Sequence, residues 1–112
     1  MVSRMNSRKQ AFIYSFTEKL LDEGFIVYSH LPGYFSPPAI EDYKPDMLAR
    51  GAFQKRIIAI KSAETYDRDS PDLATFRLYS LKTPGVSLQV YTIDKDGECR
   101  LVESTGNVQP ED

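Results

Sequence analysis

Tryptophan is absent from this 112-residue chain, and cysteine and histidine occur once each, as Cys99 and His30. A single cysteine excludes a disulfide within the chain and a cysteine-rich zinc site, and it fits a reducing compartment. The formal net charge of −2 excludes a global basic field for nucleic acid. No stretch approaches the roughly 20 apolar residues of a membrane span. We therefore expect a cytoplasmic protein without a membrane partner.

The residues that are present suit one compact domain. Hydrophobic residues make up 41% of the chain and charged residues 27%, as in ordinary globular proteins. The length is enough for one domain and too short for two of usual size. We expect a single α/β domain over residues 1–103, followed by a polar tail over residues 104–112.

Hydrophobic periodicity predicts helices and strands in a mixed order. The first helix spans residues 7–23, with Ser7 as its N-cap and Gly24 just after its end. A second helix begins after Ser70 and ends near Lys82. Strands are expected at residues 25–30, 44–50, 55–61, 86–93 and 98–102.

The strands at 44–50 and 55–61 form a predicted hairpin, closed over Gly51-Ala52-Phe53-Gln54. In such a hairpin Arg50 faces Lys55 and Asp46 faces Ala59, because opposed residues of an antiparallel pair share a face. Lys61 lies two positions beyond Ala59 and so points to that same face. One carboxylate and one ammonium group would then emerge side by side.

Both faces of this hairpin are apolar. Met47, Ile58 and Ile60 belong to one face, and Leu48 and Ile57 belong to the other. A sheet that is apolar on both faces is usually covered on both. The predicted fold class is therefore α/β, with a mixed sheet of about five strands, a central hairpin and helices on both faces.

This order of elements, with Pro45-Asp46 and an apolar strand ending at Lys61, resembles the restriction-endonuclease-like superfamily. Its motif is Pro-Asp, a spacer and Asp/Glu-x-Lys, and the resemblance extends from about residue 7 to residue 93. The resemblance implies a restriction-endonuclease-like fold and Mg²⁺-dependent cleavage of phosphodiesters. Asp46 would be a metal-binding acid, because Mg²⁺ prefers oxygen ligands, and Lys61 would stabilise developing charge.

The motif lacks part of its acidic set. The second carboxylate of the motif falls on Ala59, which cannot bind a metal. The additional glutamate that the family carries in its first helix falls near Phe12 and Ile13.

A neighbouring acid could complete the set. Glu64 lies three residues beyond Lys61, and Asp69 and Asp72 precede or begin the second helix. On this interpretation the protein is an active Mg²⁺-dependent nuclease. Asp46, Lys61 and Glu64 are then its catalytic residues, and Asp46 and Glu64 hold the metal.

Two other interpretations stay open. In the first, a nuclease-like protein has lost a complete catalytic site and acts in nucleic-acid-related binding or assembly. In the second, the protein is a homodimeric structural or regulatory protein unrelated to nucleic acid. The edge strand at 98–102 and the loop aromatics would serve such contacts.

Four cations are candidates for binding the phosphates of DNA: Arg8, Lys9, Lys55 and Arg56. Tyr34, Phe35 and Tyr43, in or next to the proline-containing loop, could add stacking surfaces for bases. The alternative is that the cations are solvated and the aromatic rings pack on the core as a lid. His30 has no catalytic dyad with Cys99 and is expected to be a hydrogen-bonded or exposed residue at a strand end. Cys99 is expected to be an inert thiol, because an acidic neighbour does not lower the pKa of a thiol.

Overall fold

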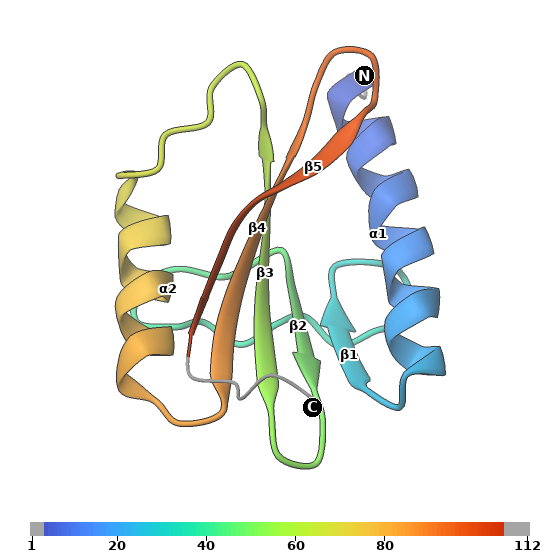
Figure 1. Ribbon diagram of the computed structural model, residues 1–112. Coiled ribbons are helices and arrows are strands. Elements are labelled where there is room, and N and C mark those ends of the chain that lie inside the picture. Colours follow the sequence, from blue (N-terminus) through green and yellow to red (C-terminus); the bar gives the residue numbers. More distant parts are fainter. Residues whose placement is uncertain (1–3, 107–112) are drawn as a thin grey trace.

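The computed structural model describes the backbone of residues 4–106 and the side chains of residues 7–106. It is an α/β structure in which a mixed sheet of five strands carries a helix on each face (Figure 1). The elements in chain order are α1 (Arg4–Asp22), β1 (Ile26–Ser29), β2 (Met47–Arg50), β3 (Lys55–Ser62), α2 (Pro71–Lys82), β4 (Val86–Ile93) and β5 (Cys99–Gly106). The strand order is β1-β2-β3-β4-β5; β3 and β4 are parallel and the other neighbours antiparallel. The predicted class and mixed sheet are confirmed.

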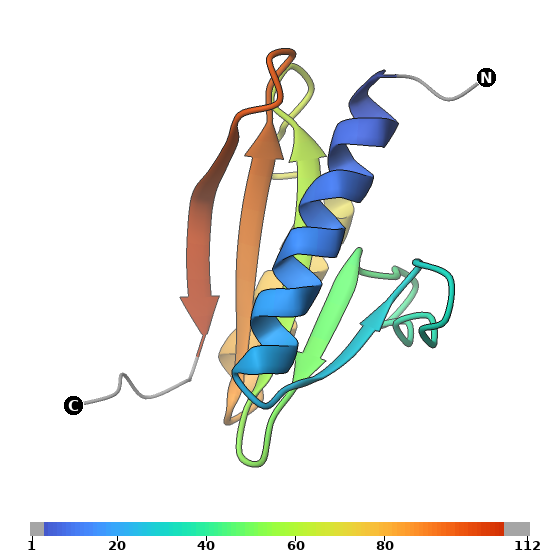
Figure 2. The same cartoon turned by 90° about the vertical axis from the view of Figure 1, so that its right-hand side faces the viewer.

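The two helices cover opposite faces of the sheet, with α1 in front of the strands in Figure 2 and α2 behind them. Met47, Ile58 and Ile60 pack under α1, whereas Leu48 and Ile57 pack under α2. Successive side chains of a strand point to opposite faces, so a strand pair that is apolar at every position needs cover on both sides. The predicted division of these residues between the faces is confirmed.

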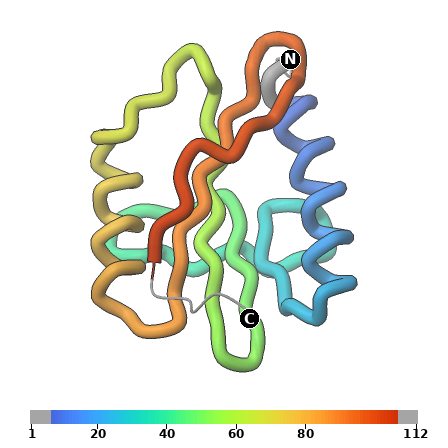
Figure 3. The backbone as a smooth tube through the Cα atoms, viewed as in Figure 1, coloured from blue at the N-terminus to red at the C-terminus, as the bar shows by residue number. Residues whose placement is uncertain are grey.

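The hairpin of β2 and β3 has the predicted register. Arg50 pairs with Lys55 and Met47 with Ile58, and the turn is closed by the Gly51 N–H donating to the Gln54 carbonyl at 2.8 Å. The turn lies at the bottom of Figure 3. β2 begins at Met47 rather than at Lys44, so Asp46 lies one residue before the strand.

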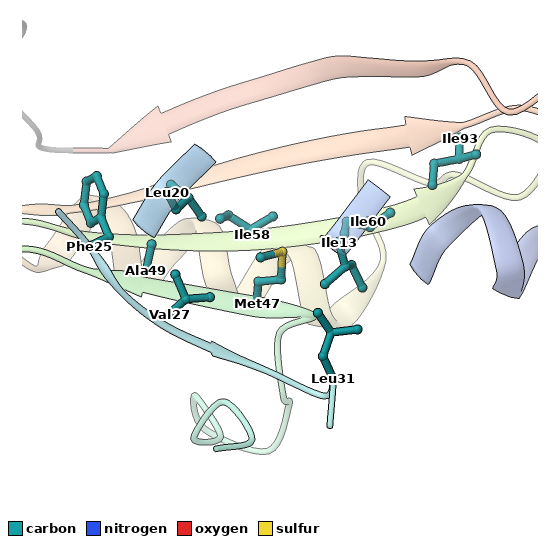
Figure 4. Packing of buried hydrophobic residues seen from close by; sticks show 10 residues of the cluster. All are labelled: Ile13, Leu20, Phe25, Val27, Leu31, Met47, Ala49, Ile58, Ile60 and Ile93. Carbon is teal, nitrogen blue, oxygen red and sulfur yellow. The ribbon is translucent and has the colours of Figure 1, made fainter. Parts of the chain in front are cut away.

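A core fills the space between α1 and the sheet (Figure 4). Ile13 and Leu20 of α1 pack in one cluster with Met47 and Ile58 of the sheet, and all four side chains are buried. A second core lies under α2. We call them the α1-side core and the α2-side core. The buried residues of the α2-side core are Ile40, Leu48, Ile57, Ala59, Leu73, Phe76, Val86, Leu88 and Val90.

Helix α1 ends as predicted but begins earlier. Gly24 has a φ of +93°, and its N–H donates to the Leu21 carbonyl at 3.0 Å while the Phe25 N–H reaches back to Leu20 at 3.0 Å. These bonds form a Schellman motif, which favours glycine at this position. The predicted N-cap, Ser7, was wrong because α1 starts at Arg4. Arginine and methionine before Ser7 are good helix formers and let the helix continue.

Helix α2 has the predicted bounds, from Pro71 to Lys82. Proline suits the first turn of a helix, because a backbone N–H at that position has no acceptor within the helix and proline has none to leave unpaired. Ser70 does not cap a backbone N–H; its hydroxyl donates to Asp72 Oδ1 at 2.7 Å instead. Among the elements of residues 4–106, no helix has the length and apolar character needed to cross a lipid bilayer.

Strand β5 is longer than predicted. It continues to Gly106, so residues 104–106, predicted as part of a polar tail, belong to the sheet; residues 107–112 lie outside the described part. The extension is held by Arg77 of α2, which donates from Nε and Nη2 to the two carboxylate oxygens of Glu103 at 2.7 and 2.8 Å. Such bidentate pairs are among the stronger ion pairs. The Thr105 hydroxyl donates to the same carboxylate at 2.7 Å.

The loop between β1 and β2 has almost no regular structure, as predicted. A single isolated bridge joins Ile40 and Tyr43 within the described residues of this loop. Leu31, Pro37 and Pro45 are buried and fix the loop to the body of the protein. The loop thus delivers Asp46 to the start of β2 in a defined position.

Candidate functional site

The residues of the predicted site gather at one end of β3. β2 runs opposite to β3, so the start of β2 lies beside the C-terminal end of β3. The second turn of α1, with Lys9, and the first turn of α2, with Asp72, approach the same end from the two faces of the sheet. We call this place the ion-paired end and define it by Lys9, Asp46, Lys61 and Asp72.

Asp46 is engaged on both of its oxygens. Oδ2 accepts a hydrogen bond from the Ile60 N–H at 2.7 Å, and Oδ1 contacts the ammonium group of Lys9 at 2.6 Å. Its side chain is 21% exposed. Asp46 lies just before β2. Its carboxylate accepts the hydrogen bond from β3 that a backbone carbonyl would accept if β2 were longer. The residue therefore has a structural role that is independent of any metal.

Lys61 contacts the carboxylate of Asp72, the second residue of α2. Asp72 Oδ1 also accepts hydrogen bonds from the Ser70 hydroxyl at 2.7 Å and from the Leu73 N–H at 2.8 Å. Burial by itself raises the pKa of the Asp72 carboxyl, but the bonds from Lys61, Ser70 and Leu73 outweigh it and bring the pKa below its usual value. Among the described residues no ion pair joins Asp46 to Lys61; each has its own partner.

Ala59 lies on β3 one residue before Ile60 and is only 1% exposed, within the α2-side core. It supplies no oxygen at the position where the resemblance requires the second acid. Glu64 is exposed in the turn after β3, where its N–H donates to the Ser62 hydroxyl at 3.3 Å. Asp69 is also exposed. Of the acids proposed to fill the gap, Asp72 is the one that reaches Lys61.

The side chains at this end do not match the donor set of a hard divalent cation. Such an ion needs several oxygen ligands around one point. Each of the two carboxylates here is already neutralised by a lysine ammonium group. Within residues 7–106 no three side chains of the histidine, cysteine, aspartate or glutamate type are grouped as a metal site requires.

The four predicted nucleic-acid-binding cations do not form one patch. Lys9 pairs with Asp46, and Arg8 lines a shallow surface hollow with Gly97 and Cys99. Lys55 and Arg56 lie at the opposite end of β3. Since a strand advances about 3.3 Å per residue, Arg56 is roughly 13 Å from Ile60, which contacts Asp46.

Arg56 is engaged on the α1 face of the sheet. Its guanidinium lies 4.7 Å from the centre of the Phe25 ring and 3.9 Å from a Glu23 oxygen. Lys55, by contrast, forms no ion pair within residues 7–106. The two members of this predicted pair therefore differ in how free they are to bind a ligand.

The other candidates are spread over the molecule. Phe35 is 82% exposed and Tyr34 37% exposed, whereas Tyr43 packs on the α2-side core. The predicted lid is therefore formed by one of the three rings. His30 is exposed at the end of β1. Burial, and to a lesser extent Asp94, raises the pKa of the Cys99 thiol and disfavours the reactive thiolate.

Sequence reasoning did not identify two residues as candidates for binding. Arg50 is exposed opposite Lys55, and Phe53 in the adjoining turn is 94% exposed. The available signal was a turn sequence in which an aromatic residue stands between two cations. Together with Lys55 we call these residues the hairpin end.

Comparison with known proteins gives no relative: no family model, no curated protein and no solved structure matches this chain. The function is therefore inferred from the residues and geometry of the chain itself.

Proposed function

We propose that this protein is a divergent, non-catalytic relative of the restriction-endonuclease-like superfamily, which binds nucleic acid without cleaving it. The observation that carries the proposal is the ion-paired end. The acid and the lysine of the resemblance, Asp46 and Lys61, are each held by a residue of opposite charge, and the intervening acid is replaced by the buried Ala59.

The arrangement of the fold supports the resemblance. A helix precedes three antiparallel strands, and a crossover helix leads to a fourth strand parallel to the third. Pro45-Asp46 stands at the start of β2 and Lys61 near the end of β3, so the motif residues lie at one end of the sheet. This is the order on which the sequence resemblance rests.

The chemistry of the ion pairs supports loss of cleavage. A nuclease of this type needs a metal ion to polarise the phosphate and acidify the attacking water. Lysine ammonium groups and Mg²⁺ compete for the same carboxylate oxygens. With Lys9 on Asp46 and Lys61 on Asp72, the negative charge that would attract the metal is already compensated.

An active Mg²⁺-dependent nuclease is the second candidate. One contact favours it: Asp72 reaches Lys61, so an acid and a lysine are adjacent although the motif position is occupied by Ala59. A metal could displace one lysine if substrate phosphates supplied further oxygens. The two candidates make opposite predictions for the same experiment.

The test is incubation of the purified chain with single- and double-stranded DNA and RNA in Mg²⁺ or Mn²⁺, with binding followed in parallel by fluorescence anisotropy. We expect binding without cleavage. Divalent-dependent cleavage that disappears in both Lys61→Gln and Asp72→Asn would overturn the non-catalytic proposal. Cleavage that persists in both variants indicates a contaminating nuclease. Absence of binding to every nucleic acid would reject the binding half of the proposal.

A further inference from the structure

The hairpin end contains two positive charges without a compensating acid. Arg50 and Lys55 are directly opposed in the register of β2 and β3. Like charges at opposed positions of an antiparallel pair are destabilising. Neither side chain forms an ion pair with any other residue in the described part of the chain, in contrast to Lys9, Lys61 and Arg77.

The same turn exposes an aromatic ring. Phe53 is 94% exposed, more than any other large hydrophobic residue between positions 7 and 106. Its ring contributes nothing to either core, so folding does not explain its presence at this position. Phe53 lies three residues after Arg50 and two before Lys55, which places an apolar ring between two cations.

The turn is held by its surroundings. The Lys55 N–H donates to the Gly85 carbonyl at 2.8 Å, next to the strand ladder. A Cβ atom at Gly85 would lie 2.9 Å from the Phe53 carbonyl oxygen, and Gly85 has a φ of +80°. The turn before β4 therefore packs tightly against the hairpin turn, so the ring and the two cations have a fixed backbone under them.

A shallow cavity of about 250 Å³ lies between these two turns. Its lining includes Arg50, Phe53 and Lys55, and the remaining lining residues are uncharged. The two turns lie next to each other at the lower end of the sheet in Figure 1. The hollow is open, basic and partly aromatic.

We propose that the hairpin end is a contact surface for single-stranded nucleic acid, with Phe53 stacking on a base and Arg50 and Lys55 binding the neighbouring phosphates. The inference rests on the proposed nucleic-acid binding and assigns it to a surface at the opposite end of β3 from Asp46. Unpaired bases offer their faces to an aromatic side chain, and cations beside the ring follow the backbone. A duplex hides those faces and gives Phe53 no partner.

Binding at this surface is weak, because the whole chain carries a net charge of −2, and it depends on salt, because cations that contact phosphates release bound counterions. Each phosphate neutralised on a single strand contributes a slope of about −0.7 to the plot of log affinity against log salt concentration. Two cations therefore predict a contribution of about −1.4 from this surface.

The experiment measures fluorescence anisotropy of a labelled oligothymidylate with the full chain at several salt concentrations. Phe53→Ala and Phe53→Leu are both expected to weaken binding about tenfold, since stacking needs the ring and not merely an apolar side chain. Arg50→Gln with Lys55→Gln is expected to weaken binding and to reduce the salt slope by about 1.4. The three side chains removed are exposed or half-buried, and circular dichroism and thermal unfolding verify that the variants fold.

The chain offers matched controls elsewhere on its surface. Tyr14→Ala removes a ring that is 52% exposed on α1, and Arg100→Gln removes a cation whose side chain is 71% exposed on β5. Neither control should change the affinity. Equal weakening by Tyr14→Ala and Phe53→Ala would show general apolar attraction and would overturn the assignment.

The outcomes separate this inference from the proposal on which it rests. Binding by the wild type that is unaffected by the hairpin-end variants overturns the inference alone. A wild type that binds no nucleic acid overturns both. Equal affinity for polyglutamate, without an effect of Phe53→Ala, would show that the surface is a nonspecific anion-binding site and would also overturn the inference.

Discussion

The two ends of β3 differ in whether their charged side chains are paired. At the ion-paired end, two lysines and two aspartates form two partly buried ion pairs, and Asp46 also accepts a hydrogen bond from the Ile60 N–H. At the hairpin end, two cations face each other without an acid, and an aromatic ring is exposed beside them. The motif residues thus lie where charges are paired, whereas the two unpaired cations lie at the other end of β3, where Lys55 is roughly 20 Å from Lys61 along the strand. The proposed binding surface therefore rests on unpaired charges and an exposed ring rather than on the motif residues.

The largest expected effect comes from restoring the missing acid. Ala59→Asp places a carboxylate in the α2-side core, where Ala59 is 1% exposed. We expect the free energy of unfolding in urea to fall by about 3 kcal/mol or more, as for other uncompensated buried charges. Because position 59 follows the hairpin register opposite Asp46, Mn²⁺ should recover part of this loss by binding both carboxylates.

Ala59→Asn is the matched control, since it has a similar size and no charge. Mn²⁺ should stabilise neither this control nor the wild type. If Mn²⁺ stabilises Ala59→Asp no more than the wild type, the ion-paired end is not one ligand short of a metal site, and the resemblance loses its chemical basis.

Removal of the Asp46 carboxylate should have the next largest effect. Asp46→Ala leaves the Ile60 N–H and the Lys9 ammonium group without their partner. We expect a loss of about 2 kcal/mol in the free energy of unfolding, measured by urea denaturation. Asp46→Asn keeps an acceptor for Ile60 and should lose about half as much. If Asp46→Ala had the same free energy of unfolding as the wild type, the structural role of Asp46 would be contradicted.

The Lys61–Asp72 pair predicts a smaller effect that depends on pH. The pKa of Asp72 is below its usual value of 3.8 in the folded protein, so the unfolded state binds a proton first as the pH falls. The carboxylate therefore stabilises the fold above pH 3.8, and this contribution is lost as the pH falls through the lower, folded pKa. We expect Asp72→Asn to cost about 1 kcal/mol at pH 7.

Urea unfolding at pH 7 and at pH 2 checks this dependence. The difference between the wild type and Asp72→Asn should shrink at the lower pH. The pKa of Glu103 is also lowered, chiefly by its bond with Arg77, but Glu103 is present in both proteins and cancels. A difference that stays constant with pH would contradict a stabilising charge on Asp72.

The smallest expected effect has the opposite sign. Arg50→Glu replaces a repulsion with Lys55 by an attraction across the hairpin, which should raise the free energy of unfolding by about 0.5 kcal/mol. The same change should abolish oligothymidylate binding at the hairpin end. Lys9→Glu, at the ion-paired end, should lower stability because it places an acid against Asp46. If Arg50→Glu and Lys9→Glu changed the free energy of unfolding in the same direction, the contrast between the two ends would be contradicted.

Local sequence patterns were sufficient for most of the fold. Gly24 marked the end of α1, Ser70 the start of α2, and the alternation of apolar residues gave the faces of β2 and β3. The extent of β5 was missed because it depends on Glu103 meeting Arg77, a contact between residues 26 positions apart. Nothing in the polar sequence around Glu103 records that partner.

The candidate site was less accessible from sequence than the fold. The spacing placed Asp46 and Lys61 at the same end of the sheet. It did not predict which cation Asp46 would contact or which acid Lys61 would contact. Lys9 was assigned to a phosphate-binding patch, whereas it lies on Asp46 because α1 crosses the sheet at that point. The direction of a long, flexible side chain is decided by tertiary packing, which the order of residues does not specify.

The bond from the Ile60 N–H to Asp46 has a consequence for how short motifs are interpreted. An aspartate directly before a strand can complete the main-chain pairing of the neighbouring strand, and a proline before it fixes the approach of the chain. Pro45-Asp46 thus works as a strand-start signal whether or not chemistry takes place beside it. A dipeptide of this kind can identify a sheet architecture in proteins that perform no hydrolysis at all.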